Sequence, residues 1–222
     1  MLELHPETII EQWRKTLSAV ERLGGDAREL QIERPATEDE IVDVERQLGV
    51  SLPVSFRHTL LTFSRAVDMS WYLPDDFDLP DEFTGIFSGN MHWSLEVLLK
   101  FERMRQDWVR VIFPDPNDPF DRHWHDKLAI YAVGNGDWIS IDLRDSSLGE
   151  IVYLSHDDGE ANGYRMASSF AELVLSWSRI GCVGGEDWQW LPFYDHSRLC
   201  INSEGDPAAR FRKLIGLSLD QA

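Results

Sequence analysis

The stretch RPATEDEIVDVERQLGVSLPVSFRHTLLTFS, residues 34–64, carries the clearest helix signals in the chain. Thr37 and Glu40 have the spacing of a capping box, in which two side chains satisfy free N–H groups at the start of a helix. An apolar stripe with helical spacing follows, made of Ile41, Val44 and Leu48. Gly49 suits the end of this helix, and Pro53 suits the first turn of another. The stretch therefore predicts two helices joined by a short segment.

Strand signals lie further along the chain. KLAIYAV (127–133) and DWISIDL (137–143) flank Gly134-Asn135-Gly136, which is typical of a hairpin turn. GEIVYLS (149–155) predicts a third strand, and a second capping box, Ser169-x-x-Glu172, opens a helix after it. The pattern predicts an α+β fold in which helices pack a mostly antiparallel meander.

The flanking regions predict additional helices at both ends. Periodic apolar residues indicate a helix over 6–23 and another from Ser94 to about residue 109, and Asp206-Pro207 opens a last short helix. Residues 66–92, rich in Pro and Asp, are expected to be irregular. We expect Trp13 and Trp177 in the core. Trp188 and Trp190 alternate along a segment expected to be extended, where core and binding patch both remain open.

Composition limits the function. The 222 residues include 39 acids and 21 bases, which gives a net charge of −18. A protein this negative repels the phosphate backbones of nucleic acids, so DNA or RNA binding is not expected. The same charge favours a basic partner. The sequence shows no signal peptide and no apolar run long enough for a membrane span, so we expect a cytoplasmic protein. Cys182 and Cys200 are interpreted as free buried thiols, although a disulfide between them remains possible.

The motifs together resemble the SUKH superfamily, the SMI/KNR-like proteins. The resemblance covers residues 34–180, and it rests on the motif run 34–64, AVGNGDWISIDL (132–143), GEIVYLSHD (149–157) and ASSFAELVLSW (167–177). Its motif residues are Pro35, Leu48, Gly49, Leu52, Pro53, Leu60, Leu61, Gly136, Asp137, Asp142 and Phe170. We expect one SUKH-like domain over residues 1–222, with extensions at 1–25 and 181–222.

The resemblance implies a binding role and no enzymatic activity. Bacterial members are immunity proteins that neutralise a cognate toxin, often a nuclease, of a contact-dependent or polymorphic toxin system. Eukaryotic relatives are regulators that act as interaction scaffolds.

The acidic segment DMSWYLPDDFDLPDE, residues 68–82, is the first candidate for a partner surface, because it has no Lys or Arg and places aromatic rings beside carboxylates. Its candidate residues are Asp68, Trp71, Tyr72, Asp75, Asp76, Asp78, Asp81 and Glu82. The alternative is a solvated loop that only maintains solubility. A second group consists of Asp115, Asp118 and Asp121.

The sequence patterns that would indicate catalysis or metal binding are weaker than those that indicate a partner surface. His123 and His125 would share one side of a strand, with Asp157 or Asp158 able to complete a metal site, but ordinary surface histidines are the favoured interpretation. Asp137 and Asp142 could form an acid/base pair, yet local hydrogen bonds at a turn and a strand end explain them more simply. We therefore assign no catalytic residue, metal or cofactor.

The function predicted from sequence is that of an immunity protein. It would bind a cationic, possibly nuclease, toxin domain and block its active site, with no direct contact to nucleic acid or membrane. A regulatory scaffold without a toxin and a metal-dependent hydrolase using His123 and His125 are the alternatives. The oligomeric state is left open.

Overall fold

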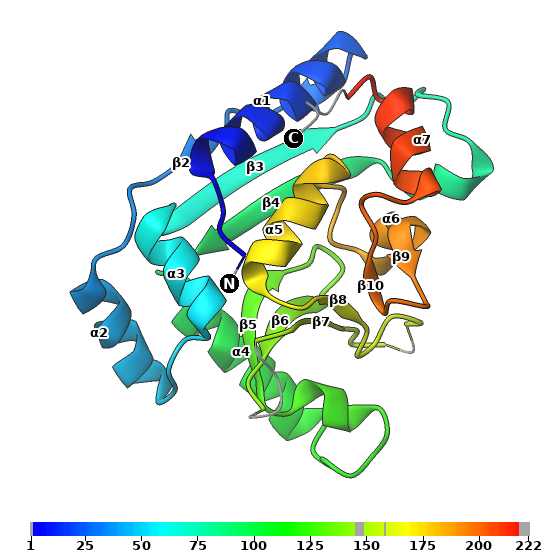
Figure 1. Cartoon of the computed structure of the whole chain (residues 1–222). Helices are drawn as coiled ribbons and strands as arrows, with labels where there is room; N and C mark the ends of the chain where they lie inside the picture. Colours follow the sequence, from blue (N-terminus) through cyan, green and yellow to red (C-terminus); the bar gives the residue numbers. More distant parts are fainter. Residues whose placement is uncertain (1, 145–148, 158, 218–222) are drawn as a thin grey trace.

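The computed structural model describes residues 2–144, 149–157 and 159–217. Two antiparallel sheets form its framework (Figure 1). In the first, β3 (Ala66–Tyr72) pairs along its whole length with β4 (Ser88–Ser94). The short strands β1 (Asp26–Ala27) and β2 (Gln31–Ile32) also pair with β3.

The second sheet is the expected meander. Its order is β5 (Lys127–Ala132), β6 (Trp138–Asp142), β7 (Ile151–Leu154) and β8 (Arg165–Ala167), with every pair antiparallel. The turn between β5 and β6 is closed by a bond from Val133 N to Asp137 O at 2.9 Å. Gly136 has φ of 102°, which favours glycine because side chains are strained there. The hairpin prediction is thus confirmed, whereas β8 was not anticipated.

Helices cover the sheets. Helix α5 (Phe170–Arg179) packs against both α1 (Pro6–Arg22) and α3 (Val54–Thr62), and α1 packs on β3 (Figure 1). Helix α4 (Leu98–Val111) packs on β5 and, through Phe101 and Trp108, on the face of the second sheet that carries Trp138. Ile139, next to Trp138 on β6, belongs to the main core, so the second sheet is covered on both faces.

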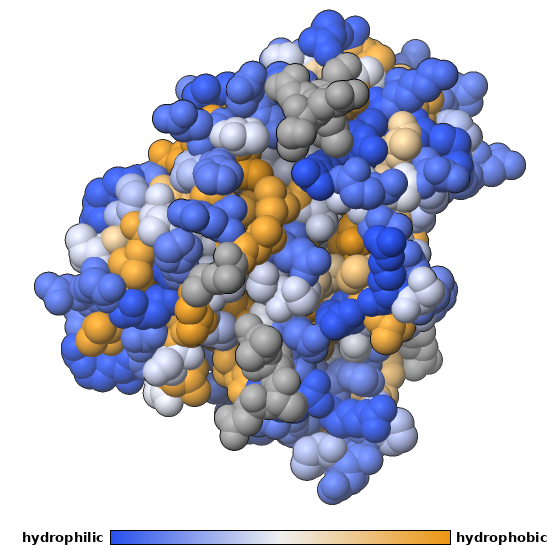
Figure 2. Space-filling view, in the orientation of Figure 1, coloured by the Kyte–Doolittle hydropathy of each residue, from blue (hydrophilic) through white to orange (hydrophobic). Residues whose placement is uncertain are grey.

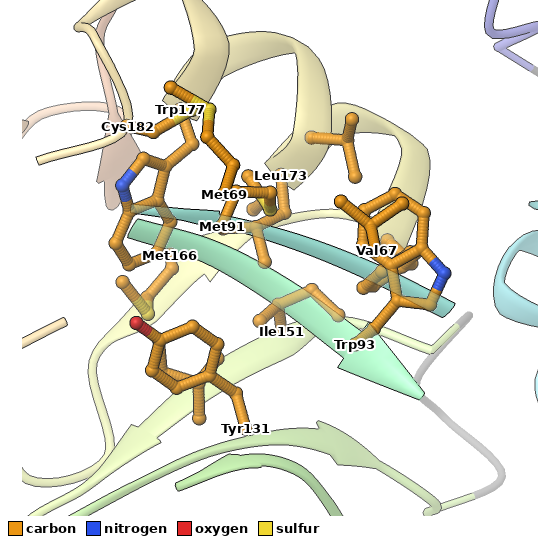
Figure 3. Close-up of a cluster of buried hydrophobic side chains, with 14 of the residues drawn as sticks. Val67, Met69, Met91, Trp93, Tyr131, Ile151, Met166, Leu173, Trp177 and Cys182 are labelled. Atoms are coloured by element: carbon orange, nitrogen blue, oxygen red, sulfur yellow. The ribbon is translucent and has the colours of Figure 1, made fainter. Parts of the chain in front are cut away.

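The main core joins the two sheets to α5. Figure 3 shows Met69 and Trp93 from the first sheet, Tyr131 and Ile151 from the second and Trp177 from α5 gathered in one cluster. Trp13 is also fully buried, and its indole donates to Ser178 Oγ at 2.8 Å. The core positions expected for Trp13 and Trp177 are confirmed.

The helix boundaries follow from local signals. Thr37 and Glu40 form the predicted capping box of α2 (Glu38–Leu48), which ends at Gly49 with φ of 74°. Ser169 accepts a bond from Glu172 N at 3.2 Å, but the Glu172 carboxylate accepts from Ser168 N instead of Ser169 N, so the second capping box forms only in part.

The family-motif residues lie mostly in the packed interior. The buried ones are Leu52, Leu60, Asp137, Asp142 and Phe170. Leu48, Pro53 and Leu61 are half-buried, while Pro35, Gly49 and Gly136 are exposed. The expectation that at least one of Leu60 and Leu61 is deeply buried is confirmed, because Leu60 has no exposed surface.

Two predictions of local structure are wrong. Residues 66–92 are not one irregular segment, because β3 and most of β4 lie within them and only the connection between the strands is irregular. Ser94 ends β4 and does not start a helix, which begins at Leu98. β3 and β4 together contain one acidic residue, Asp68, and the Pro and Asp residues that suggested irregular structure lie mostly in the connection between the strands.

The Trp-rich segment is also different from the prediction. Trp188 and Trp190 lie on a short helix, α6 (Asp187–Trp190), which leaves Trp188 exposed and Trp190 buried. Near the C-terminus, β9 (Tyr194–Asp195) pairs with β10 (Cys200–Ile201), and α7 (Asp206–Leu214) follows. Cys182 and Cys200 are free, as predicted, but only Cys182 is buried.

We expect His92 to make the fold less stable in mild acid. Its ring stacks on Tyr131 at 3.8 Å between centroids, and burial lowers the pKa of His92 to about 4 despite the opposing charge of Asp68. Unfolded histidine titrates near pH 6.5. Between these values only the unfolded state binds the proton, so stability falls as pH drops, by about 2 kcal/mol at pH 5.

Urea denaturation of the wild type and the His92→Gln variant at pH 7 and pH 5 measures this effect. The loss of stability on acidification should be about 2 kcal/mol smaller in the variant. Identical losses in the two proteins would contradict the assignment.

Candidate functional site

The acidic loop, residues 73–87, connects β3 to β4 and lies beside α7 (Figure 1). Phe83 is buried and anchors the loop, with its ring 5.3 Å from that of Phe211 and 5.8 Å from that of Phe193. Glu82 forms an ion pair with Arg210 of α7 at 2.7 Å. The loop is therefore held against the C-terminal part of the chain.

Four carboxylates of the acidic loop point into solvent: those of Asp75, Asp76, Asp78 and Asp81 are on exposed residues. Within residues 2–144, 149–157 and 159–217, none of these four side chains makes a hydrogen bond or an ion pair. Glu82 differs, since its hydrogen bond with Arg210 lowers the pKa of the Glu82 carboxyl. The face drawn in Figure 2 is predominantly hydrophilic around this region.

The aromatic residues of the acidic segment separate into anchors and exposed groups. Trp71 is fully buried, and its indole donates to Gly181 O at 2.8 Å, so its expected place on a partner surface is corrected. It lies on the inner face of β3, where the alternation of a strand sends every second side chain into the core. Tyr72 faces the other way and is 39% exposed, and Asp68 is exposed on the same face.

Two further exposed aromatic residues lie at the acidic loop: Phe87, which was not singled out from the sequence, and Trp188, for which core and binding patch were left open. Phe87 is 50% exposed and Trp188 is 46% exposed. The Gln189 side chain joins their segments, because its Oε1 accepts from Phe87 N at 3.3 Å. This juxtaposition spans about a hundred residues of sequence, and no local pattern could have predicted it.

The second acidic group lies elsewhere. Figure 1 places the loop before residue 121 at the opposite end of the molecule from the acidic loop. Asp118 accepts bonds from Phe120 N at 2.7 Å and Asp121 N at 3.1 Å, and these bonds lower its pKa. Asp121 accepts from Asp115 N at 3.1 Å. The carboxylates of Asp118 and Asp121 therefore stabilise the turn in which they lie.

The histidine pair considered for a metal does not converge. His123 lies in a 3-10 helix, Asp121–Trp124, followed by His125, so the strand on which both would share a side does not exist. His125 Nε2 lies 2.9 Å from Phe113 O. A side chain on Gly163 would collide with the His123 ring, which shows how closely the two are packed. Asp158 lies outside the described residues.

A different group, Asp137, His156 and Asp157, offers ligand atoms within 4.8 Å of one another. Asp137 Oδ2 accepts from Tyr153 OH at 2.5 Å and Asn135 Nδ2 at 2.7 Å, while Oδ1 accepts from His156 N at 2.8 Å and lies 2.6 Å from His156 Nδ1. All the lone-pair directions of the carboxylate are thus engaged, and a cation would have to displace these donors. We call these residues the Asp137 network.

The Asp137 network connects the β5–β6 turn to the end of β7. It extends the local bonds expected for Asp137, because Tyr153 and His156 come from another strand and the loop after it. Asp142 instead bonds to Arg144 N at 3.0 Å and to the Arg144 guanidinium, and lies 3.6 Å from Lys127 Nζ. The two aspartates are therefore held in separate networks.

Among the described residues, no helix has both the length and the apolar composition needed to cross a bilayer.

The fold and the exposed residues together define the class of protein. This is an α+β protein in which helices pack on antiparallel sheets, and its exposed carboxylates and aromatic rings suit contact with another protein. The model of the SMI1 / KNR4 family (SUKH-1) matches residues 35–176, and the chain belongs to this family. The resemblance found in the motifs is confirmed. Family membership supports an immunity-type or protein-interaction role in general. A comparison with curated proteins finds no match.

Proposed function

We propose that this chain is an immunity protein that binds a cationic toxin domain, such as that of a nuclease, and blocks its active site. Its action is binding and not catalysis. The observation that carries the proposal is the set of four exposed carboxylates, Asp75, Asp76, Asp78 and Asp81, on a loop anchored by Phe83 and Glu82.

The anchoring matters for both stability and recognition. Carboxylates close together repel one another, and this repulsion is relieved when a positive surface approaches. A loop that is already ordered loses little conformational entropy on binding. In a nuclease, such carboxylates would occupy positions where the enzyme holds the phosphates of its substrate, and the bulk of the protein would cover the site.

We expect the triple variant Asp75→Asn, Asp76→Asn, Asp78→Asn to associate about tenfold more slowly with its partner at low ionic strength, because long-range attraction acts on the encounter. Dissociation should change less. The difference should shrink as salt rises, since the Debye length falls to about 8 Å at physiological ionic strength. Stopped-flow kinetics with the product of a toxin reading frame next to the gene measures both rates.

A matched control separates local from overall charge. Glu3, Glu7 and Asp39 are exposed, and changing them to Gln, Gln and Asn removes the same charge outside the acidic loop. The control should retain most of the wild-type association rate. If the triple variant associates at the wild-type rate at low salt, the acidic loop has no part in recognition, and the group Asp115, Asp118 and Asp121 becomes the next candidate.

A further inference from the structure

Trp188 differs from the other tryptophans of the chain. All nine lie in the described residues, and eight of them are buried or half-buried, whereas Trp188 is 46% exposed. A tryptophan is the largest apolar side chain, and leaving it in water forfeits the free energy that burial would supply. Exposed tryptophans are therefore typical of binding surfaces.

The acidic loop holds Trp188 in place. A Cβ on Gly85, which belongs to this loop, would lie 3.0 Å from Trp188 Cδ1, so the absence of a side chain allows the indole to lie close to the loop backbone. The Gln189 side chain joins α6 to the end of the acidic loop and the start of β4, because its Oε1 accepts from Phe87 N at 3.3 Å and from Ser88 N at 3.2 Å. Trp188 and the free carboxylates are thus presented by segments in direct contact.

The negative charge near Trp188 restricts which kind of molecule can bind at this surface. The adjoining loop carries Asp75, Asp76, Asp78 and Asp81, and Glu186 lies two residues before Trp188. A second copy of the chain would bring two molecules of net charge −18 together at their acidic loops, which is unfavourable. A cationic partner is attracted to the same place.

We propose that Trp188 and the acidic loop together recognise arginine side chains of the partner in preference to lysine; this inference rests on the proposed function. A guanidinium is planar and can stack on an aromatic face while its N–H groups donate to carboxylates, whereas an ammonium is a compact, strongly hydrated point charge. The chain already contains one contact between a guanidinium and an aromatic ring, since the Arg28 guanidinium lies 5.7 Å from the centroid of the exposed Tyr72 ring. Trp188 offers a larger aromatic face, on a segment that contacts the acidic loop at Gly85.

Two synthetic peptides of equal length and charge, one with arginines and the other with lysines at the same positions, test the inference. Titration monitored by tryptophan fluorescence and by calorimetry gives the two dissociation constants. We expect the arginine peptide to bind about three- to tenfold more tightly, with a change in indole fluorescence. Trp188→Leu should remove this preference and leave the weaker, salt-dependent binding of both peptides.

The control is Leu199→Ala, a truncation of another exposed apolar side chain, which should keep the arginine preference. Circular dichroism of each variant verifies that it folds. Equal affinities for the two peptides in the wild type, or an unchanged preference in Trp188→Leu, would overturn the inference while the acidic loop could still steer a cationic partner. If peptide binding were also unaffected by the Asp75, Asp76 and Asp78 triple variant, the electrostatic part of the proposed function would fail as well.

Discussion

Replacing Asp137 by Ala is expected to lower the free energy of unfolding by about 3–5 kcal/mol, because the change removes a buried carboxylate and leaves its donors without an acceptor. Asp137 is only 2% exposed. The Tyr153 hydroxyl loses its acceptor, as do the Asn135 amide and the His156 backbone N–H. The β5–β6 turn would then be joined to β7 by fewer bonds.

Chemical denaturation of the variant measures the effect, and two further variants define its origin. Asp78→Ala removes an exposed carboxylate of the acidic loop and should change stability by less than about 0.5 kcal/mol. Tyr153→Phe removes one of the donors and should cost about 1–2 kcal/mol. A loss for Asp137→Ala as small as that for Asp78→Ala would show that the Asp137 network contributes little to stability.

Leu60→Ala is expected to cost about 2–5 kcal/mol, the range typical of a fully buried leucine. Leu60 has no exposed surface and packs in the main core from α3. The neighbouring Leu61 is half-buried and lies at the edge of the same core, so truncating it to Ala should cost less than half as much. The comparison is well matched, because the two substitutions are chemically identical and adjacent.

Urea denaturation at neutral pH measures both variants. Similar small losses for Leu60 and Leu61 would mean that α3 does not face the core in the register described. A larger loss at Leu61 than at Leu60 would mean that α3 is rotated about its axis by about 100°, the angle between successive residues, relative to the orientation described.

We propose that the two extensions belong to the same folding unit as the family core. Trp13 of α1 stacks on Phe63 at 5.6 Å between centroids, and Phe211 of α7 contacts Phe83 of the acidic loop. The main apolar core includes residues from Leu4 to Leu217. Removing either extension would expose these aromatic rings.

Local signals allowed part of the fold to be predicted. The capping box of Thr37 and Glu40, the left-handed Gly49 and the turn at Gly134-Asn135-Gly136 depend on bonds between residues within a few positions of one another. Such bonds need only residues that are neighbours in the sequence, so the residue types indicate them. The motif order was sufficient to predict the family.

The sequence by itself therefore determined the α+β class, the two ends of α2, the hairpin and the acidic character of the loop. Only the tertiary structure decided that Trp71 is an anchor while Trp188 is exposed, and that Glu82 is paired while Asp75 is free. It also decided that Asp137 meets His156. Each of these outcomes depends on contacts between distant segments, and burial and charge pairing are properties of the packed chain and not of any short stretch of it.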